Sequence, residues 1–163
     1  MAGLDQIFKA YDVRGTVPDQ LDAVLAERIG QAFAVFARKA SSAGTVTRVL
    51  VARDMRPSGV ELAAAFAEGV QRQGLDVVDL GLASTDLLYF ASGKLGAPGV
   101  VFTASHNPAQ YNGIKMCLAG AKPIGQDTGL GTIRDLVEKG LPDRMGEPGG
   151  VETMDLLEAF AEH

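Results

Sequence analysis

Short runs of β-branched residues alternate with helical periodicity along most of this chain. Residues 46–52, 75–80 and 99–103 are such runs and suit strands. Residues 21–39 carry apolar side chains three and four positions apart, which is typical of an amphipathic helix. Alternating strands and helices predict a layered α/β domain with a mixed, mostly parallel sheet flanked by helices.

Capping residues predict where the next two helices begin and end. Residues 58–61, Ser-Gly-Val-Glu, have the spacing of a capping box and are expected to open a helix that ends near Gly74. Ser84 or Thr85 is expected to cap a second helix, which ends near Gly96.

The last third of the chain predicts one more strand and helix, followed by a linker. The strand is expected at 113–118 and the helix at 127–139. Residues 140–150 contain four glycines and two prolines, a composition that breaks both helix and strand. We therefore expect one domain over 1–140. Residues 141–163 are expected to form a linker and the start of a helix that leads to a second domain outside this chain.

Composition argues against several classes of protein. The chain has 163 residues and is 47% hydrophobic, enough for one domain with a buried core. Its net charge of −5, without blocks of like charge, argues against binding to nucleic acid or an anionic membrane. No segment approaches the roughly 20 apolar residues of a spanning helix, and no signal peptide is recognised. Cys117, the only cysteine, is expected to be a small buried hydrophobe. A cytoplasmic protein is the expectation.

Residues that could carry chemistry gather in 103–115, Thr-Ala-Ser-His-Asn-Pro-Ala-Gln-Tyr-Asn-Gly-Ile-Lys. Ligands of open α/β sheets bind beyond the carboxyl ends of strands, so Ser105 is expected to face a ligand there. On the residues alone, a polar turn whose side chains satisfy the backbone is an equal alternative. A serine hydrolase is disfavoured, because neighbours such as Ser105 and His106 rarely point at each other and no Gly-x-Ser-x-Gly elbow is present.

The same segment resembles the active-site loop of the α-D-phosphohexomutases, the phosphomannomutase and phosphoglucomutase group. The match lies in Thr-Ala-Ser-His-Asn-Pro and in Tyr-Asn-Gly-x-Lys. Residues 8–15, Phe-Lys-Ala-Tyr-Asp-Val-Arg-Gly, are similar to the family's opening motif, and residues 53–58, Arg-Asp-Met-Arg-Pro-Ser, resemble a third, weaker one. Thr85 is followed by aspartate where similar proteins often have proline, a departure that bears only on the helix start. The resemblance covers almost the whole chain but only the first of the family's four domains.

The resemblance implies a phosphoserine at Ser105 that donates its phosphoryl group to a hexose monophosphate. The resulting hexose 1,6-bisphosphate turns round in the site and returns its other phosphoryl group. Arg14 and Lys115 would flank the phosphoserine, and His106 and Tyr11 would line the same site. Because an ammonium can lose its proton whereas a guanidinium stays charged, Lys115 is expected to carry the proton and Arg14 to clamp the phosphate.

The family also implies a Mg²⁺ ion, held by an aspartate triad of the second domain. No Asp-x-Asp-x-Asp occurs in this chain, so Ser105, through its phosphate, is the one expected ligand here. The isolated chain is therefore expected to be inactive or nearly so. Its expected partners are a phosphosugar substrate and the remaining domains of the same polypeptide.

Two alternative functions remain open for a chain with these motifs. Phosphoglucosamine mutase is the nearest competing activity, against which Thr103 weighs weakly, since those enzymes often have serine there. A non-catalytic phosphate-binding module of the same fold is the second. Arg53, Asp54 and Arg56, between a strand end and a helix start, are expected to form a structural ion pair or to brace a loop.

Overall fold

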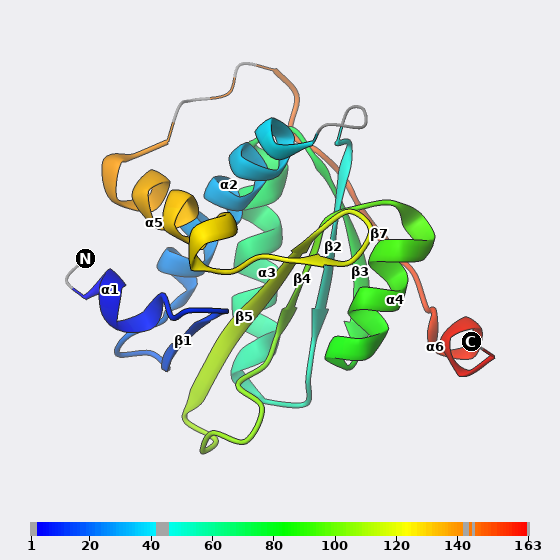
Figure 1. The fold of residues 1–163 in the computed structure, drawn as a ribbon, viewed down its shortest axis with the longest axis horizontal. Coiled ribbons are helices and arrows are strands. Elements are labelled where there is room, and N and C mark those ends of the chain that lie inside the picture. Colours follow the sequence, from blue (N-terminus) through cyan, green and yellow to red (C-terminus); the bar gives the residue numbers. More distant parts are fainter. Residues whose placement is uncertain (1–2, 42–45, 142–143, 145, 163) are drawn as a thin grey trace.

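A mixed sheet runs through the centre of the molecule, with helices on both faces (Figure 1). The structure is a computed structural model that describes residues 3–41, 46–141, 144 and 146–162, and within them the sheet has seven strands. Their order is β1-β5-β4-β2-β3-β7, with β6 paired to β5. The predicted layered α/β class is confirmed.

The sheet divides into a parallel and an antiparallel part. The parallel strands are β4 (Gly99–Phe102), β2 (Arg48–Arg53), β3 (Asp76–Leu82) and β7 (Val151–Thr153). The antiparallel strands are β5 (Tyr111–Leu118), β1 (Val13–Thr16) and β6 (Lys122–Pro123). Strands β1, β6 and β7 have no counterpart in the sequence-based expectation. The three predicted runs correspond to β2, β3 and β4.

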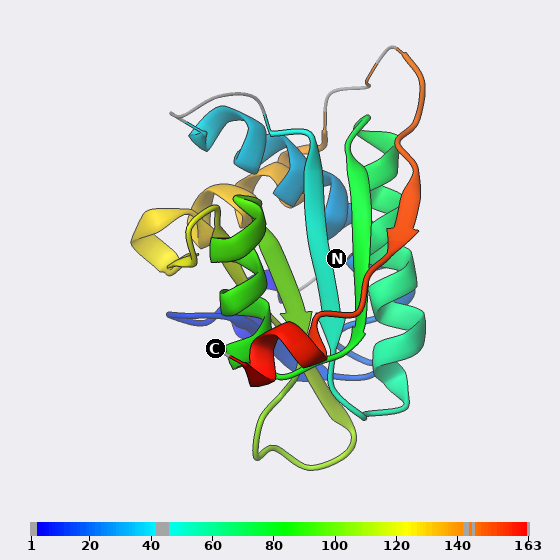
Figure 2. The ribbon, with the colours of Figure 1, turned by 90° about the vertical axis from the view of Figure 1, so that its right-hand side faces the viewer.

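Two helical layers cover the sheet (Figures 1 and 2). The helices are α1 (Leu4–Ile7), α2 (Ala23–Ala40), α3 (Ser58–Arg72), α4 (Thr85–Leu95), α5 (Leu130–Lys139) and α6 (Leu157–Ala161), with a 3₁₀ turn at Gln126–Thr128. The larger core joins α2, α3 and α5 to one face, and the smaller core joins α4 to the other. Figure 2 shows α3 and α4 on opposite sides of β2 and β3. No helix of the described residues is long and apolar enough to cross a membrane.

Local signals placed two of the helices correctly. The Asp22 carboxylate accepts a hydrogen bond from the Leu25 backbone N–H at 2.9 Å and caps α2. The Ser84 hydroxyl caps α4 by accepting from the Leu87 N–H at 3.0 Å, and Gly96 ends that helix with a positive φ of 61°. Both predicted helices are confirmed. The helix over 21–39 was predicted from its apolar periodicity and its Asp22 cap was not expected, whereas the Ser84 cap and the Gly96 terminus were.

The capping box predicted at residues 58–61 is wrong. Ser58 is the first residue of α3, Pro57 precedes it, and no side chain caps the helix. The Ser58 hydroxyl instead accepts a hydrogen bond from Asn112 Nδ2 at 2.9 Å. A buried strand residue therefore engages the hydroxyl that the local pattern had assigned to the helix.

The segment after residue 140 contributes to the sheet. Strand β7 runs parallel to β3, with Val77 opposite Val151, and α6 follows it, with Phe160 packed against Phe90 at 5.6 Å between ring centroids. Residues 142, 143 and 145 of the predicted linker, and the final residue 163, lie outside the described part of the chain. The domain boundary near residue 140 stays a prediction.

Helices α2 and α3 approach each other at two glycines. A Cβ at Gly30 would overlap the carbonyl oxygen of Phe66, and one at Gly69 would overlap that of Glu27. The Phe66 ring of α3 packs against the Phe33 ring of α2 at 5.8 Å between centroids. The close approach thus depends on the absence of side chains at both glycines.

Cys117 is fully buried on β5 against the α4 side of the sheet. Burial raises the pKa of the Cys117 thiol, which disfavours the thiolate. The expectation of a small buried hydrophobe is confirmed.

Candidate active site

The loop of residues 103–110 leaves the carboxyl end of β4 and returns as β5. It projects from the lower end of the sheet in Figure 1. The Thr103 N–H donates to the Gly113 carbonyl at 3.0 Å, which closes the base of the loop. A turn follows, in which the Asn107 N–H donates to the Ala104 carbonyl at 3.0 Å. The loop therefore has a defined conformation at the sheet end where α/β proteins bind ligands.

Ser105 lies exposed in this turn with a positive φ of 53°. Its backbone N–H donates to the Thr103 hydroxyl at 3.1 Å. Its own hydroxyl has no hydrogen-bond partner among the described residues. A serine that served only the turn would hydrogen-bond a nearby backbone group through its hydroxyl. The polar-turn alternative therefore explains Thr103, whose hydroxyl accepts from the backbone, but it does not explain Ser105.

Arg14 reaches the loop from β1. Its Nη1 donates to Asn107 Oδ1 at 3.2 Å, and its Nη2 to Asp12 Oδ1 at 3.3 Å. The Asp12 side chain is 6% exposed, whereas that of Arg14 is 39% exposed. Two polar groups therefore orient a guanidinium that still has donors accessible to an anion.

Gly113 allows β1 to lie this close to the loop. Its register partner on β1 is Arg14. A Cβ at Gly113 would overlap the Val13 carbonyl oxygen and lie 2.9 Å from that of Thr103. Any larger residue would separate the strand that carries Arg14 from the loop that carries Ser105.

Lys115 lies on β5 opposite Val101 of β4. Val13 and Ile114 belong to the core on the α2 and α3 side, so by strand alternation Arg14 and Lys115 share the opposite face of the sheet. Among the described residues the Lys115 ammonium has no hydrogen bond or ion pair. The structure thus places two cations on one face, Arg14 at the loop and Lys115 farther along β5.

His106 and Tyr11 occupy different surroundings. His106 is exposed beside Ser105 in the loop, and its ring has no hydrogen bond within the described residues. Tyr11, 83% exposed, lies in the turn where the Lys9 N–H donates to the Asp12 carbonyl at 2.8 Å. There Tyr11 borders a hollow of about 330 Å³ beside residues 125–128. This turn precedes the first residue of β1. The last residue of β1, Thr16, is the one that pairs with Tyr111 beside the loop. Tyr11 therefore lies at the end of β1 away from Ser105.

Arg56 makes the most extensive contacts with the loop. Its Nη1 donates to the carbonyls of Pro108 and Tyr111 at 2.7 and 2.9 Å, and its Nη2 to those of Ser105 and Asn107 at 2.9 and 2.8 Å. The expected loop-bracing role is confirmed for Arg56. The number of its bonds was not expected, because carbonyl acceptors carry no signature in the sequence.

Magnesium does not fit the residues that this structure describes. They contain no group of three or more histidine, cysteine, aspartate or glutamate side chains arranged to hold a metal. The carboxylate of Asp12 is paired with Arg14, and three loop carbonyls and that of Tyr111 accept hydrogen bonds from Arg56. A phosphate on Ser105 would supply only part of an octahedral shell.

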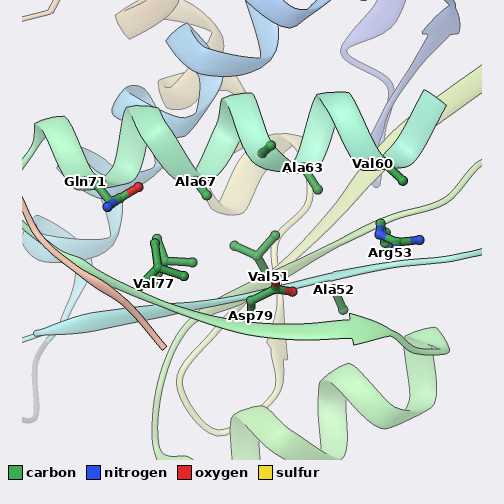
Figure 3. A pocket seen from close by; sticks show the side chains of 11 residues that line it. Val51, Ala52, Arg53, Val60, Ala63, Ala67, Gln71, Val77 and Asp79 are labelled. Atoms are coloured by element: carbon green, nitrogen blue, oxygen red, sulfur yellow. The ribbon is translucent and has the colours of Figure 1, made fainter. Parts of the chain in front are cut away.

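A groove of about 400 Å³ lies apart from the loop, between α3 and the strands β2, β3 and β7 (Figure 3). Valine and alanine side chains make up most of its lining, which also includes Arg53 and Asp79. None of the site residues predicted from sequence lines this groove. The polar site on the loop, rather than this apolar groove, carries the candidate chemistry.

Comparison with known proteins gives concordant matches. Residues 5–143 match the family model for phosphoglucomutase/phosphomannomutase, alpha/beta/alpha domain I. The chain is 38% identical to a phosphomannomutase of Vibrio cholerae over 96% of its own length and 34% of the relative's. It is 41% identical to a phosphomannomutase of Klebsiella pneumoniae over 81% of its own length and 80% of the relative's.

Solved structures give the same result. The fold superposes with a TM-score of 0.85 on a phosphoglucomutase/phosphomannomutase family protein from Burkholderia thailandensis, at 34% identity. That match covers 99% of this chain and 35% of the other chain. The chain thus spans about a third of the length of this structure and of the Vibrio cholerae relative.

Proposed function

The chain belongs to the phosphoglucomutase/phosphomannomutase family, and from this premise we propose that it supplies the phosphoserine half of a hexose phosphate mutase. Ser105 carries the proposal. Its exposed hydroxyl has no partner among the described residues, while the surrounding loop is held by main-chain and arginine contacts. The reaction is the reversible interconversion of a hexose 1-phosphate and a hexose 6-phosphate, an isomerisation achieved by phosphoryl transfer.

Each half-reaction exchanges one phosphorus–oxygen bond for another. In the first, the bond from phosphorus to Ser105 Oγ breaks as a sugar hydroxyl oxygen bonds to phosphorus. The hydroxyl loses its proton, Oγ gains one, and the products are free serine and a hexose 1,6-bisphosphate. In the second, the reoriented bisphosphate returns its other phosphoryl group to Ser105 and leaves the isomerised monophosphate. The enzyme ends as it began, phosphorylated.

Charge and position are the main requirements of this chemistry. A phosphoserine carries about −1.5 to −2 charges at neutral pH, and Arg14 lies at the loop with part of its guanidinium exposed. We assign it the role of phosphate clamp. Lys115, on the same face and without an ion pair among the described residues, is assigned proton transfer. His106 and Tyr11 are proposed to line the path of the substrate, His106 at the loop and Tyr11 away from it.

Other parts of the active site must come from outside this chain. The described residues contain no group of histidine, cysteine, aspartate or glutamate side chains that could hold magnesium, and the chain spans about a third of the length of the Vibrio cholerae relative. The isolated chain is therefore proposed to be inactive or nearly so. Its proposed partners are a phosphosugar and the remaining domains of a longer polypeptide. A cytoplasmic location is proposed because the lone cysteine fits a reducing compartment.

Mass spectrometry tests the function directly. The protein encoded by the complete reading frame is incubated with hexose 1,6-bisphosphate, and peptides are sequenced to locate the added phosphoryl group. We expect it on Ser105, together with conversion of glucose or mannose 1-phosphate to the 6-phosphate. Phosphorylation without conversion would favour the non-catalytic module, and preferential conversion of glucosamine phosphates would favour phosphoglucosamine mutase. A phosphoryl group on another residue would refute the assignment of Ser105.

A charge-preserving exchange separates the roles of the two cations. Lys115→Arg keeps the charge but removes a group that readily loses a proton, so kcat is expected to fall by about 10²-fold or more. Arg14→Lys keeps the charge but loses the second terminal nitrogen of the guanidinium as a hydrogen-bond donor. We therefore expect kcat to fall by about tenfold. Steady-state kinetics on both variants provides the comparison. Near-normal kcat in Lys115→Arg would mean that Lys115 contributes charge alone.

A further inference from the structure

We propose that Arg56 is the positioning residue of the phosphoserine loop, so that its guanidinium sets the placement of Ser105 for phosphoryl transfer. The proposal rests on the proposed function of Ser105 and extends it to a residue whose side chain contacts the carbonyls of residues 105–111 and the carboxylate of Asp54. Arg56 comes from the connection between β2 and α3, and its contacts cross to the connection between β4 and β5.

The contacts of Arg56 converge on one short segment. All four accepting carbonyls lie within residues 105–111, and each terminal nitrogen donates to two of them. One acceptor is the carbonyl of Ser105 itself. A planar guanidinium offers its donors in a rigid fork, so the four carbonyls are held relative to one another as well as to α3.

Arg56 is itself held in place. Its side chain is 11% exposed, and its Nε lies 3.5 Å from Asp54 Oδ2. The Arg56 backbone N–H donates to Asp54 Oδ1 at 3.0 Å. Asp54 therefore engages both the main chain and the side chain of Arg56, and a largely buried charge gains a partner. The fork is preorganised before any ligand arrives.

The contacts of Arg56 affect phosphoryl transfer at Ser105 in two ways. Four carbonyl oxygens, whose partial negative charge would repel a phosphoryl group, are engaged by a cation. The Asn107 carbonyl accepts from Arg56, while the Asn107 side chain accepts from Arg14 at 3.2 Å. One loop residue thus links the positioning arginine to the phosphate clamp. A displacement of the loop by about 1 Å costs on the order of 10²-fold in rate.

The test is Arg56→Lys in the protein from the complete reading frame. Lysine keeps the charge, but its single nitrogen cannot bridge four carbonyls in one plane. We expect kcat per folded molecule to fall by about 10²-fold, with KM changed by less than about threefold. Arg48→Lys is the matched control, because Arg48 lies at the other end of β2 and donates to one carbonyl, that of Leu95. Its kcat and KM should stay at the wild-type values.

Each outcome bears on the proposal. Wild-type kcat in Arg56→Lys, or equal losses in Arg56→Lys and Arg48→Lys, would overturn it. If Arg56→Lys unfolds, Arg56→Gln and thermal unfolding follow, and unfolding of both variants would overturn it by showing a role in global stability. Ser105→Ala is run alongside. Its inactivity beside a normal Arg56→Lys refutes only this inference, whereas full activity of Ser105→Ala refutes the proposed function too.

Discussion

Replacing Ser105 with alanine is expected to lower turnover of hexose phosphates by more than about 10⁴-fold, as loss of a catalytic nucleophile does. Alanine has no oxygen to accept the phosphoryl group, so neither the phosphoenzyme nor the bisphosphate can form. Because the Ser105 hydroxyl has no partner among the described residues, its removal should leave the fold intact. Coupled-enzyme assays and intact-mass analysis of the complete protein provide the measurement.

Ser105→Gly separates the hydroxyl from the backbone conformation. Ser105 has a φ of 53°, a region that costs an L-residue about 1 kcal/mol and that glycine adopts freely. The glycine variant should therefore match the alanine variant in lost activity while unfolding at the same or a higher temperature. Retained turnover in either variant would exclude Ser105 as the phosphoryl acceptor. A loss of turnover that followed loss of folded protein would point to the backbone instead.

Gly30→Ala is expected to destabilise the domain by about 3 kcal/mol. The added methyl group would overlap the Phe66 carbonyl oxygen where α2 crosses α3, so the two helices would have to separate. Gly69→Ala inserts a methyl group on the other helix of the same crossing, against Glu27, and should act similarly. Denaturant unfolding followed by circular dichroism measures the change.

Gly93→Ala is the matched control. Gly93 lies inside α4, where an added Cβ would meet nothing within 4 Å. Alanine there should stabilise the domain by about 0.5–1 kcal/mol, because it favours the helix more than glycine does. The two substitutions are chemically identical and should shift the unfolding midpoint in opposite directions. Stabilisation by Gly30→Ala would contradict the close crossing of α2 and α3.

Sequence reasoning succeeded where the decisive contacts are local. The predicted cap at Ser84 and the predicted terminus at Gly96 involve residues within about one helical turn of their partners, and the helix predicted over 21–39 follows from apolar side chains three and four positions apart. The four-residue strand β1, by contrast, exists because it pairs with β5 about a hundred residues later. Its sequence, Val-Arg-Gly-Thr, is too short and too mixed to show strand periodicity by itself.

The candidate site, like the fold, was predictable from sequence only where local motifs identify its residues. Ser105, Lys115 and Arg14 were identified through motifs that resemble a family, and the structure places Arg14 at the loop and Lys115 on the same face of the sheet. Arg56 was expected to brace the loop, yet its four bonds go to main-chain carbonyls, which every residue has. The wrong prediction for Ser58 has the same cause, because the Ser58 hydroxyl accepts a hydrogen bond from Asn112, a residue distant in sequence.

The pairing of β1 with β5 also bears on the order in which the site assembles during synthesis. A ribosome that has released Arg14 must translate about a hundred further residues before Gly113, the register partner of Arg14, leaves the exit tunnel. Until then β1 has no strand to pair with, and Arg14 cannot contact the loop that carries Ser105. The nascent chain can complete β2, α3 and β3 beforehand, so the candidate site at the carboxyl end of β4 is among the last parts of the domain to form.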